Sequence, residues 1–215
     1  MFNLFKRKDN FLITDNFIEI EENFDHQHLN LAIWQRSPND EILRYIKFLQ
    51  VTEFTSFSYA LSAKSLVKEV EDMFLTKIPQ FPFIKNDSLK EDVILLTQYY
   101  IKLSGKQKLN LHLKLVNNYA SRKFHVDGYE SRLLCTYERA RTEWLENRNV
   151  KRSALGSENN KIVKNWKAIR QMKPFEVGFL KGENLRYPNG KGIVYRSPPI
   201  EATGKKRFLL RIDAL

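Results

Sequence analysis

A histidine and an aspartate two positions apart, in Phe124-His125-Val126-Asp127, are the residues of this sequence best suited to hold a metal ion. If the segment is a β-strand, both side chains point to the same face, because alternate residues of a strand share a face. Imidazole and carboxylate are two of the three ligands in the facial 2-His-1-carboxylate set, which binds ferrous iron and leaves positions open for a co-substrate and dioxygen. The motif supplies these two ligands, but no histidine follows Asp127 that could be the third.

The three other histidines offer weaker possibilities. His112 lies on the polar face of a predicted strand and would complete the ligand set if that face points inward, but an exposed strand histidine is the favoured interpretation. His26 and His28 would share a face only in an extended segment, so a solvated loop is favoured over a ligand pair. The single cysteine, Cys135, lies in an apolar run, which indicates a core residue and excludes an intramolecular disulfide.

The elements that must position these residues change type along the chain. Helices are predicted over about 38–50, 59–75 and 88–105, from apolar residues at helical spacing, a Ser37-Pro38 start and a capping box at Ser88 to Glu91. After Gly105 the period becomes two, and an earlier strand is expected at 31–34. Further strands are predicted at 124–127, 132–137, 175–181, 191–195 and 207–212.

This order predicts an α+β protein that forms one globular unit. A mainly helical part, residues 1–105, would pack outside a strand-rich part, residues 106–215, whose antiparallel sheet closes on itself. The segment from about 146 to 173 is polar, basic and irregular, as expected of an excursion that covers the mouth of a site.

Composition limits the partners. The net charge of +11 would suit an anionic partner, but the lysines are spread along the chain, and the densest cluster, Lys205-Lys206-Arg207, sits beside a predicted strand. Nucleic-acid binding is therefore not favoured. No segment has the roughly 18–20 apolar residues of a membrane span, and the first residues do not resemble a secretory signal, so a cytoplasmic protein is expected.

Several second-half motifs together resemble a bacterial protein family, the domain of unknown function 1826, from about residue 109 to the C-terminus. They are Phe124-His125-Val126-Asp127, Arg132-Leu133-Leu134-Cys135-Thr136-Tyr137, Thr142-Glu143-Trp144-Leu145, Leu180-Lys181-Gly182-Glu183 and Tyr195-Arg196-Ser197-Pro198-Pro199. With histidine at position 195, the family's usual residue, this layout is similar to the iron and 2-oxoglutarate oxygenases. The resemblance therefore implies a double-stranded β-helix, a jelly-roll or cupin-like barrel, for residues 106–215.

The resemblance also implies a set of metal ligands. His125 and Asp127 would be the first two ligands of Fe(II), and Tyr195 stands at the third position. A tyrosine can ligate iron only as a phenolate, which favours ferric iron, whereas an oxygenase starts from the ferrous ion. Tyr195 would thus mean a weakened enzyme, an altered metal, or a site kept only for binding.

Basic residues near the end of the chain would bind the co-substrate. In the resembling oxygenases, a basic residue about ten to twelve positions past the last ligand pairs with the far carboxylate of 2-oxoglutarate. Arg207 fits best, because its guanidinium can bind a carboxylate in a fork, and Lys205 is the alternative. Arg132 and Arg196 are further cofactor-binding candidates, and a structural salt bridge is an equal alternative for Arg132.

Three functions stay open. The first is a 2-oxoglutarate-dependent dioxygenase acting on an unknown small molecule or protein side chain. The second is a non-catalytic barrel that binds a metal or an anion through a degenerate iron site. The third is a metal-handling protein that uses His26, His28 and the barrel site together.

Overall fold

The computed structural model describes residues 10–52, 54–116, 121–138, 141–183, 192–200 and 206–215, and the strands of this part form two sheets. The large sheet has the spatial order β1 (Phe11–Thr14), β2 (Leu31–Trp34), β8 (Val177–Lys181), β5 (Ser131–Thr136), β10 (Arg207–Ala214), β4 (Lys108–Val116) and β3 (Phe57–Ser62). The small sheet has the order β7 (Arg170–Gln171), β6 (Glu143–Leu145) and β9 (Val194–Arg196). Neighbouring strands are antiparallel except for β1 and β2.

Segments of the second half alternate between the two sheets. After β4 in the large sheet comes the segment at His125, which pairs with Tyr195 of β9 by an antiparallel bridge. The chain then returns to the large sheet as β5, forms β6 and β7 in the small sheet, and alternates again through β8, β9 and β10. This order brings the end of the chain beside β4 and β5, where β10 is paired on both sides.

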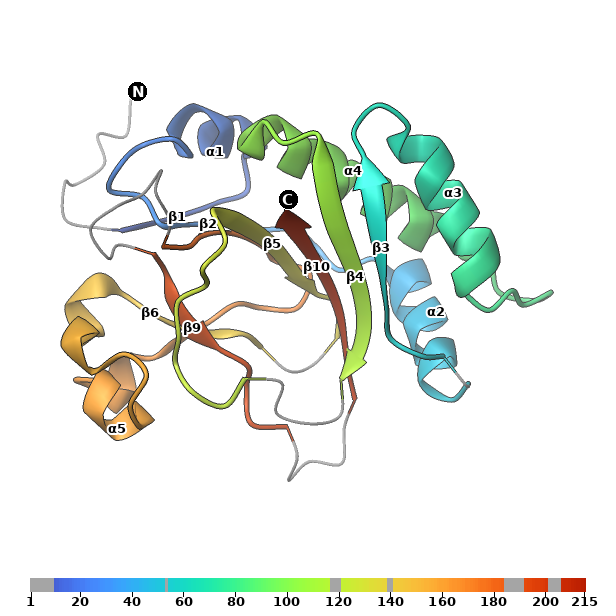
Figure 1. Cartoon of the computed structure of the whole chain (residues 1–215). Coiled ribbons are helices and arrows are strands. Elements are labelled where there is room, and N and C mark those ends of the chain that lie inside the picture. Colours follow the sequence, from blue (N-terminus) through green and yellow to red (C-terminus); the bar gives the residue numbers. More distant parts are fainter. Residues whose placement is uncertain (1–9, 53, 117–120, 139–140, 184–191, 201–205) are drawn as a thin grey trace.

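Helices cover one side of the large sheet. The helices are α1 (Phe17–Asn23), α2 (Asp40–Gln50), α3 (Leu66–Lys77), α4 (Asp87–Ser104) and the short α5 (Asn159–Ile162). Figure 1 shows α2, α3 and α4 together on one side of the sheet and α5 beside β6 and β9. None of the helices in the described ranges is long and apolar enough to cross a membrane. The N-terminal part also supplies β1, β2 and β3 to the edges of the large sheet, so it is joined to the later strands by hydrogen bonds.

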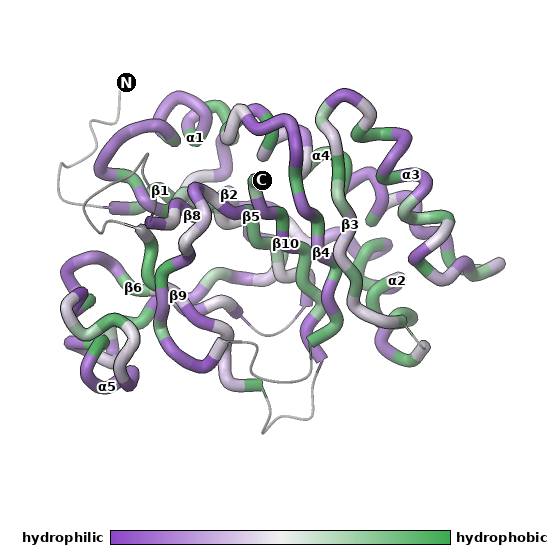
Figure 2. The backbone as a smooth tube through the Cα atoms, in the orientation of Figure 1, coloured by the Kyte–Doolittle hydropathy of each residue, from purple (hydrophilic) through white to green (hydrophobic). Residues whose placement is uncertain are grey.

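The two faces of the large sheet have different chemistry. Alternating residues of β4 and β10, such as Leu111 and Leu210, are fully buried in the main core with the helices. The residues between them, including His112, Lys114 and Arg211, face the small sheet. Figure 2 shows this alternation along both strands. The period of two predicted for β4 is confirmed, and it leaves a polar face on the side where the site lies.

The space between the sheets also contains an apolar part. Large-sheet residues such as Leu134, Leu180 and Leu209 meet Trp144 and Ile193 of the opposite side in one buried cluster. This cluster holds the small sheet against the large one, because burial of apolar area is the main favourable term in packing. The inner space is therefore divided into an apolar region and a charged region.

Three helix predictions need correction. The segment predicted as a helix over 59–75 is strand β3 followed by α3, because residues 57–62 pair with β4 and only the later residues form a helix. The helix predicted over 38–50 begins at Asp40, and its first amides bond to the Asn39 side chain rather than to Ser37. Helix α4 begins after Asn86 without the predicted capping box, and it ends at Gly105 in the left-handed conformation as expected.

The irregular excursion covers a different surface from the one predicted. It contains short 3₁₀ turns (Asn147–Asn149, Arg152–Ala154 and Trp166–Ala168) and α5. Val150, Ile162 and Val163 pack against Leu145 and Val194 on the outer face of the small sheet. None of residues 146–173, all of which are described, lines the pocket between the sheets. The excursion stabilises the back of the small sheet and does not cover the mouth of the site.

Candidate functional site

The His125 segment is held against β9 by its backbone. His125 N donates to Tyr195 O over 3.1 Å, and Tyr195 N donates to His125 O over 3.0 Å. The two rings lie side by side with centroids 4.7 Å apart. His125 Nδ1 lies 3.0 Å from Lys123 O, so Nδ1 carries the proton and Nε2 is the free acceptor. His125 and Tyr195, two of the predicted ligands, are therefore brought together by backbone pairing.

Gly182 positions the turn that carries Asp127. Glu183 N donates to Asp127 O over 2.8 Å, and Gly182 N donates to Glu130 O over 3.1 Å. A Cβ atom on Gly182 would lie 2.0 Å from Tyr129 O and 2.6 Å from Asp127 O. Backbone carbonyls cannot move away as a flexible side chain would, so only glycine fits between β8 and this turn.

Gly182→Ala is expected to displace the Asp127 turn and to lower the free energy of unfolding by roughly 1–3 kcal/mol, the usual cost of overpacking. Gly128→Ala is the matched control, because a Cβ there meets nothing within 4 Å. Urea denaturation of both variants checks this. Equal stability of the two variants would show that the close approach at Gly182 does not hold the turn.

Asp127, Tyr195 and Arg132 form a closed triangle of hydrogen bonds. Tyr195 Oη donates to Asp127 Oδ2 over 2.6 Å, while Arg132 Nη1 donates to Tyr195 Oη over 2.6 Å and to Asp127 Oδ2 over 2.7 Å. Burial, and next the charge of Asp127, raise the pKa of Tyr195 well above its usual range. The phenol therefore keeps its proton at neutral pH and gives it to the carboxylate as a hydrogen bond.

A chain of buried charges continues behind Arg132. Its Nε donates to Asp213 Oδ1 over 2.5 Å, and His112 Nε2 lies 3.1 Å from Asp213 Oδ2. Burial alone would raise the pKa of Asp213, but the contacts with His112 and Arg132 hold it below its usual value. His112 also bonds to Ser58 at 2.5 Å. The expectation that His112 is exposed is wrong, because it is buried within this network.

Arg207 has an unusual environment for an arginine. It is 3% exposed, and its guanidinium donates only to hydroxyls, over 2.7 Å to Thr136 and 2.6 Å to Thr142. Among the residues that the structure describes, no carboxylate forms an ion pair with it. Burial lowers the pKa of Arg207 to about 10, which still leaves it charged at neutral pH. Arg207 is thus a buried cation that no carboxylate of the described ranges pairs with.

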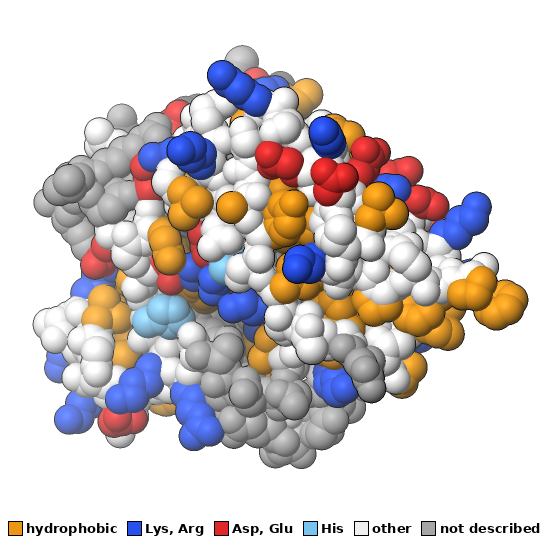
Figure 3. Space-filling view, turned by 45° about the vertical axis from the view of Figure 1, so that its right-hand side comes forward, with side chains coloured by type: hydrophobic (Ala, Val, Ile, Leu, Met, Phe, Trp, Pro, Cys, Tyr) orange, Lys and Arg blue, Asp and Glu red, His pale blue; other side chains and the backbone are white. Residues whose placement is uncertain are grey.

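These residues meet at one pocket between the sheets, with a cavity volume of about 80 Å³. That volume holds roughly five to eight water molecules, since one needs about 10–15 Å³. Figure 3 shows histidine and basic side chains gathered at the hollow on this face. No described carboxylate side chain lines the pocket. Five basic side chains do: Lys114, Arg132, Arg196, Arg207 and Arg211. The pocket is suited to a small anion.

The contacts of Tyr195 do not fit a three-ligand iron site. Its hydroxyl donates to Asp127 and accepts from Arg132, so a metal would have to displace both bonds and would meet the charge of Arg132 directly. Within the described ranges, no group of three His, Cys, Asp or Glu side chains is arranged to hold a metal ion. His125 Nε2 and Asp127 Oδ1 remain as a possible pair, 3.8 Å apart.

Other residues singled out from the sequence have structural partners or lie elsewhere. Arg196 is paired with Glu143 over 2.7 Å and lies 4.5 Å from the Phe124 ring centroid, at the pocket wall. Burial raises the pKa of the Cys135 thiol to about 12, as expected for a core residue. His26 and His28 are exposed, with ring centroids 5.6 Å apart, in the loop before β2. Lys205 lies outside the described residues.

The structure adds functional candidates to which the sequence analysis assigned no role. Asp213 anchors Arg132, and Thr136 and Thr142 orient Arg207. Lys114 and Arg211 line the pocket beside them. The alternation of β10 could have identified Arg207, Arg211 and Asp213, because all three charged residues of this strand lie on the same face.

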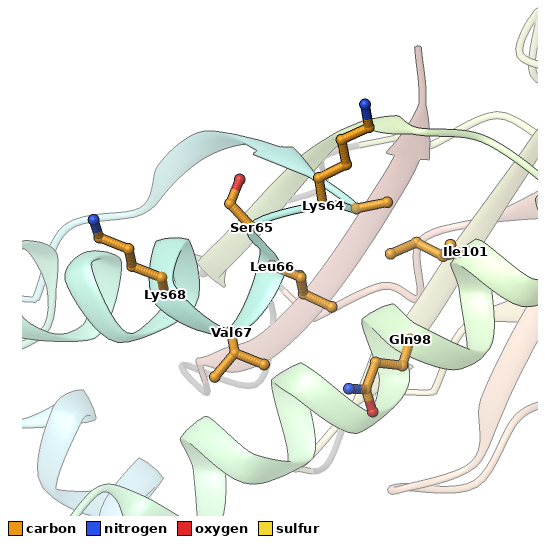
Figure 4. A pocket seen from close by; sticks show the side chains of 8 residues that line it. Lys64, Ser65, Leu66, Val67, Lys68, Gln98 and Ile101 are labelled. Carbon is orange, nitrogen blue, oxygen red and sulfur yellow. The ribbon is translucent and has the colours of Figure 1, made fainter.

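One hollow on the helical side lacks comparable chemistry. It has a volume of about 400 Å³ and lies between the start of α3 and α4 (Figure 4). Its side chains include Leu66, Val67, Gln98 and Ile101, with Lys64 and Lys68 pointing outward. None of the buried charged residues described above lines this hollow, so the smaller pocket between the sheets is the better candidate for a binding site.

Comparisons with known proteins agree with the strand arrangement. The fold is similar to that of the dioxygenase for auxin oxidation 1 from Arabidopsis thaliana, solved in a binary complex with 2-oxoglutarate, with a TM-score of 0.52, 8% identity, and coverage of 96% of this chain and 92% of that one. A Pseudomonas putida prolyl-4-hydroxylase has a TM-score of 0.49 and 7% identity, with coverage of 93% and 98%. At these identities the likeness concerns the fold alone, and it is a dioxygenase-like fold.

The sequence matches no curated protein. It does match one family profile, described as "Protein of unknown function (DUF1826)", over residues 19–213. That range contains helices α2 to α5, the small sheet, the large sheet except for β1 and the last residue of β10, and every described residue of the pocket. The expected resemblance to this family is confirmed, and the chain belongs to the DUF1826 family.

Proposed function

We propose that this protein binds a small dicarboxylate between its two sheets, with one carboxylate held by Arg207, and that this binding does not require iron. The observation that carries the proposal is the buried Arg207 guanidinium with hydroxyl partners only. Taking an ion out of water costs several kcal/mol when no opposite charge offsets it. A chain retains such a cation most readily where a bound anion completes the pair.

The surroundings of Arg207 suit a carboxylate. Thr136 and Thr142 accept from Nε and Nη2 and so fix the plane of the guanidinium. The two N–H groups of Nη1 have no partner among the described residues, so they can donate to a carboxylate of the ligand. Leu134 and Leu209 line the same pocket and can contact the methylene groups of the ligand. The positively charged lining would favour the entry of a doubly negative molecule.

The fold supports the same class of ligand. The alternation of segments between the sheets is the order of a double-stranded β-helix, and we infer that residues 106–215 form one. The similar Arabidopsis protein was solved with 2-oxoglutarate, which is itself a dicarboxylate. By the family resemblance residue 195 stands at the third ligand position, and the Tyr195 hydroxyl here bonds to Asp127 and Arg132. The proposed function is therefore that of an anion-binding relative of the dioxygenase-like proteins.

Calorimetry with glutarate, in buffer that contains a metal chelator, tests the proposal. One glutarate per chain is expected to bind, with an affinity that falls as the salt concentration rises. Arg148→Gln is a control for general charge effects, because the Arg148 side chain is 79% exposed and away from the pocket. Absence of glutarate binding in the presence of chelator would overturn the proposal. It would also be overturned if Arg148→Gln and Arg207→Gln lowered the affinity for glutarate equally.

A second candidate function is an iron-dependent oxygenase, favoured by the orientation of His125. Histidines that ligate metals almost always donate their other ring N–H to a carbonyl, carboxylate or water, and His125 Nδ1 lies 3.0 Å from Lys123 O. Ferrous iron, when bound to such a site, would supply oxidation by dioxygen. His125 and Asp127 would hold it, and the present contacts of Tyr195 oppose it.

Tyr195→His is expected to improve metal binding at His125 and Asp127. The change removes the phenol that bridges Asp127 and Arg132, and it supplies a neutral imidazole at the third ligand position. Titration with Mn²⁺, followed by electron paramagnetic resonance, should show at least tenfold tighter binding than in the wild type. Tyr195→Phe is the control, since it removes the hydroxyl without adding a ligand. Equal affinity of the two variants would show that residue 195 does not face the metal position.

A further inference from the structure

The pocket has a second group of basic side chains beside the one at Arg207. Lys114 of β4 lies opposite Leu209 in the register, and Arg211 of β10 lies opposite His112. Both side chains line the pocket. Arg207 and Arg211 are four residues apart on one strand, so their Cα atoms are separated by roughly 13 Å. Arg207 and Arg211 thus lie toward two ends of the same inner face, and Lys114 lies at a level between them.

The second group carries charge that the protein does not balance. In the part of the chain that the structure describes, Lys114 forms no hydrogen bond or ion pair. Arg211 Nε lies 3.1 Å from Asp213 Oδ2 but is a buried nitrogen without a hydrogen bond. Asp213 also pairs with Arg132 at 2.5 Å, but Arg132 has Asp127 as a second carboxylate at 2.7 Å, and Arg211 Nη2 lies 2.8 Å from His112 Nε2. The charge without a described carboxylate partner is therefore that of the Lys114 side chain.

The pKa of Lys114 reflects its burial and the neighbouring positive charge. Partial burial, followed by the nearby charge of Arg211, lowers the pKa of Lys114 below its usual value. Like charges on a concave surface destabilise the empty pocket, and an anion between them would reverse the effect. The apolar side chains Leu134 and Leu209 separate this region from Arg207.

We propose that Lys114 and Arg211 form a second anion subsite, so that the ligand carries two anionic groups joined by a short apolar linker. This inference rests on the proposed function, because the other anionic group would bind at Arg207. It narrows the ligand class to dianions with separated charges, for which glutarate would be shorter than the best fit. The apolar middle of the pocket would contact the linker.

A series of straight-chain dicarboxylates, from succinate through glutarate to pimelate, tests the second subsite by calorimetry. In the wild type, adipate or pimelate is expected to bind at least tenfold more tightly than glutarate, because only a longer chain reaches both subsites. Lys114→Gln should remove this gain, so that adipate and pimelate bind the variant no more tightly than glutarate does. Lys108→Gln is the matched control, since Lys108 is an exposed residue of the same strand outside the pocket.

The outcomes separate this inference from the proposed function. If glutarate binds but longer dicarboxylates bind no more tightly, the second subsite is wrong and the site at Arg207 stands. If Lys114→Gln weakens all dicarboxylates equally, or as little as Lys108→Gln does, the second subsite is again wrong. If no dicarboxylate binds at all, the proposed function itself fails. Thermal melting of both variants confirms that they are folded.

Discussion

Arg207→Gln is expected to lose dicarboxylate binding and to remain at least as stable as the wild type. The substitution removes two charge-assisted hydrogen bonds to the ligand, each worth about 1.5–3 kcal/mol, so the affinity should fall by roughly 100-fold or more. It also removes a buried cation that no described carboxylate pairs with. The glutamine amide can still donate to Thr136 or Thr142, which limits the cost of the change.

Calorimetry with glutarate and urea denaturation measure the two effects on the same preparation. Arg207→Lys is the informative companion, because it keeps the charge but loses the planar fork, and an intermediate affinity is expected. A structural role for Arg207 would give the opposite pattern. In that case Arg207→Gln would be destabilised by several kcal/mol while its ligand affinity stayed near that of the wild type.

Asp213→Asn is expected to cause the largest loss of stability, roughly 3–5 kcal/mol, which is the usual cost of removing one partner of a buried ion pair. The Asp213 side chain is 2% exposed and faces Arg132 at 2.5 Å and Arg211 at 3.1 Å. An amide can bond to these groups, but it cannot offset their charges. The variant would leave Arg211 without its carboxylate and Arg132 with Asp127 alone.

The pH dependence of the wild type should follow from the same residue. Because its folded pKa is held below the usual value, Asp213 contributes stability that is present above about pH 4 and is lost as the pH falls further. Asp213→Asn should therefore show a weaker loss of stability in acid than the wild type. Asp87→Asn is the control, since Asp87 forms an exposed pair with Lys90. Equal unfolding free energies of Asp213→Asn and Asp87→Asn at pH 7 would contradict the account.

Much of the strand half was predictable because its signal is local. The alternation in β4 is confirmed. The strand predicted at 124–127 is a single bridge between His125 and Tyr195, and the contact of Asp127 with Tyr195 was expected from the family resemblance and not from local spacing. The failure at 59–75 has a physical reason. Residues 57–62 also contain apolar residues at a spacing that fits a helix, and their pairing with β4 overrides local preference.

The state of Tyr195 was not predictable from the sequence. It depends on Arg132, 63 residues away, and on Asp127, 68 residues away, and Arg132 in turn depends on Asp213. No local pattern encodes which of several arginines enters the ligand position. Arg207 was found from its distance to residue 195, whereas its lack of a described carboxylate partner became visible only in the folded chain.

The most direct test of the central claim compares 2-oxoglutarate with glutarate, which differ by the keto oxygen that can chelate a metal. Calorimetry on the wild type is done twice, once with a chelator and once, without oxygen, with Mn²⁺. If Arg132 and Tyr195 occupy the third ligand position, the two acids should bind with affinities within about threefold of each other under both conditions. Binding of 2-oxoglutarate that is ten or more times tighter than that of glutarate, and only with Mn²⁺, would contradict the account.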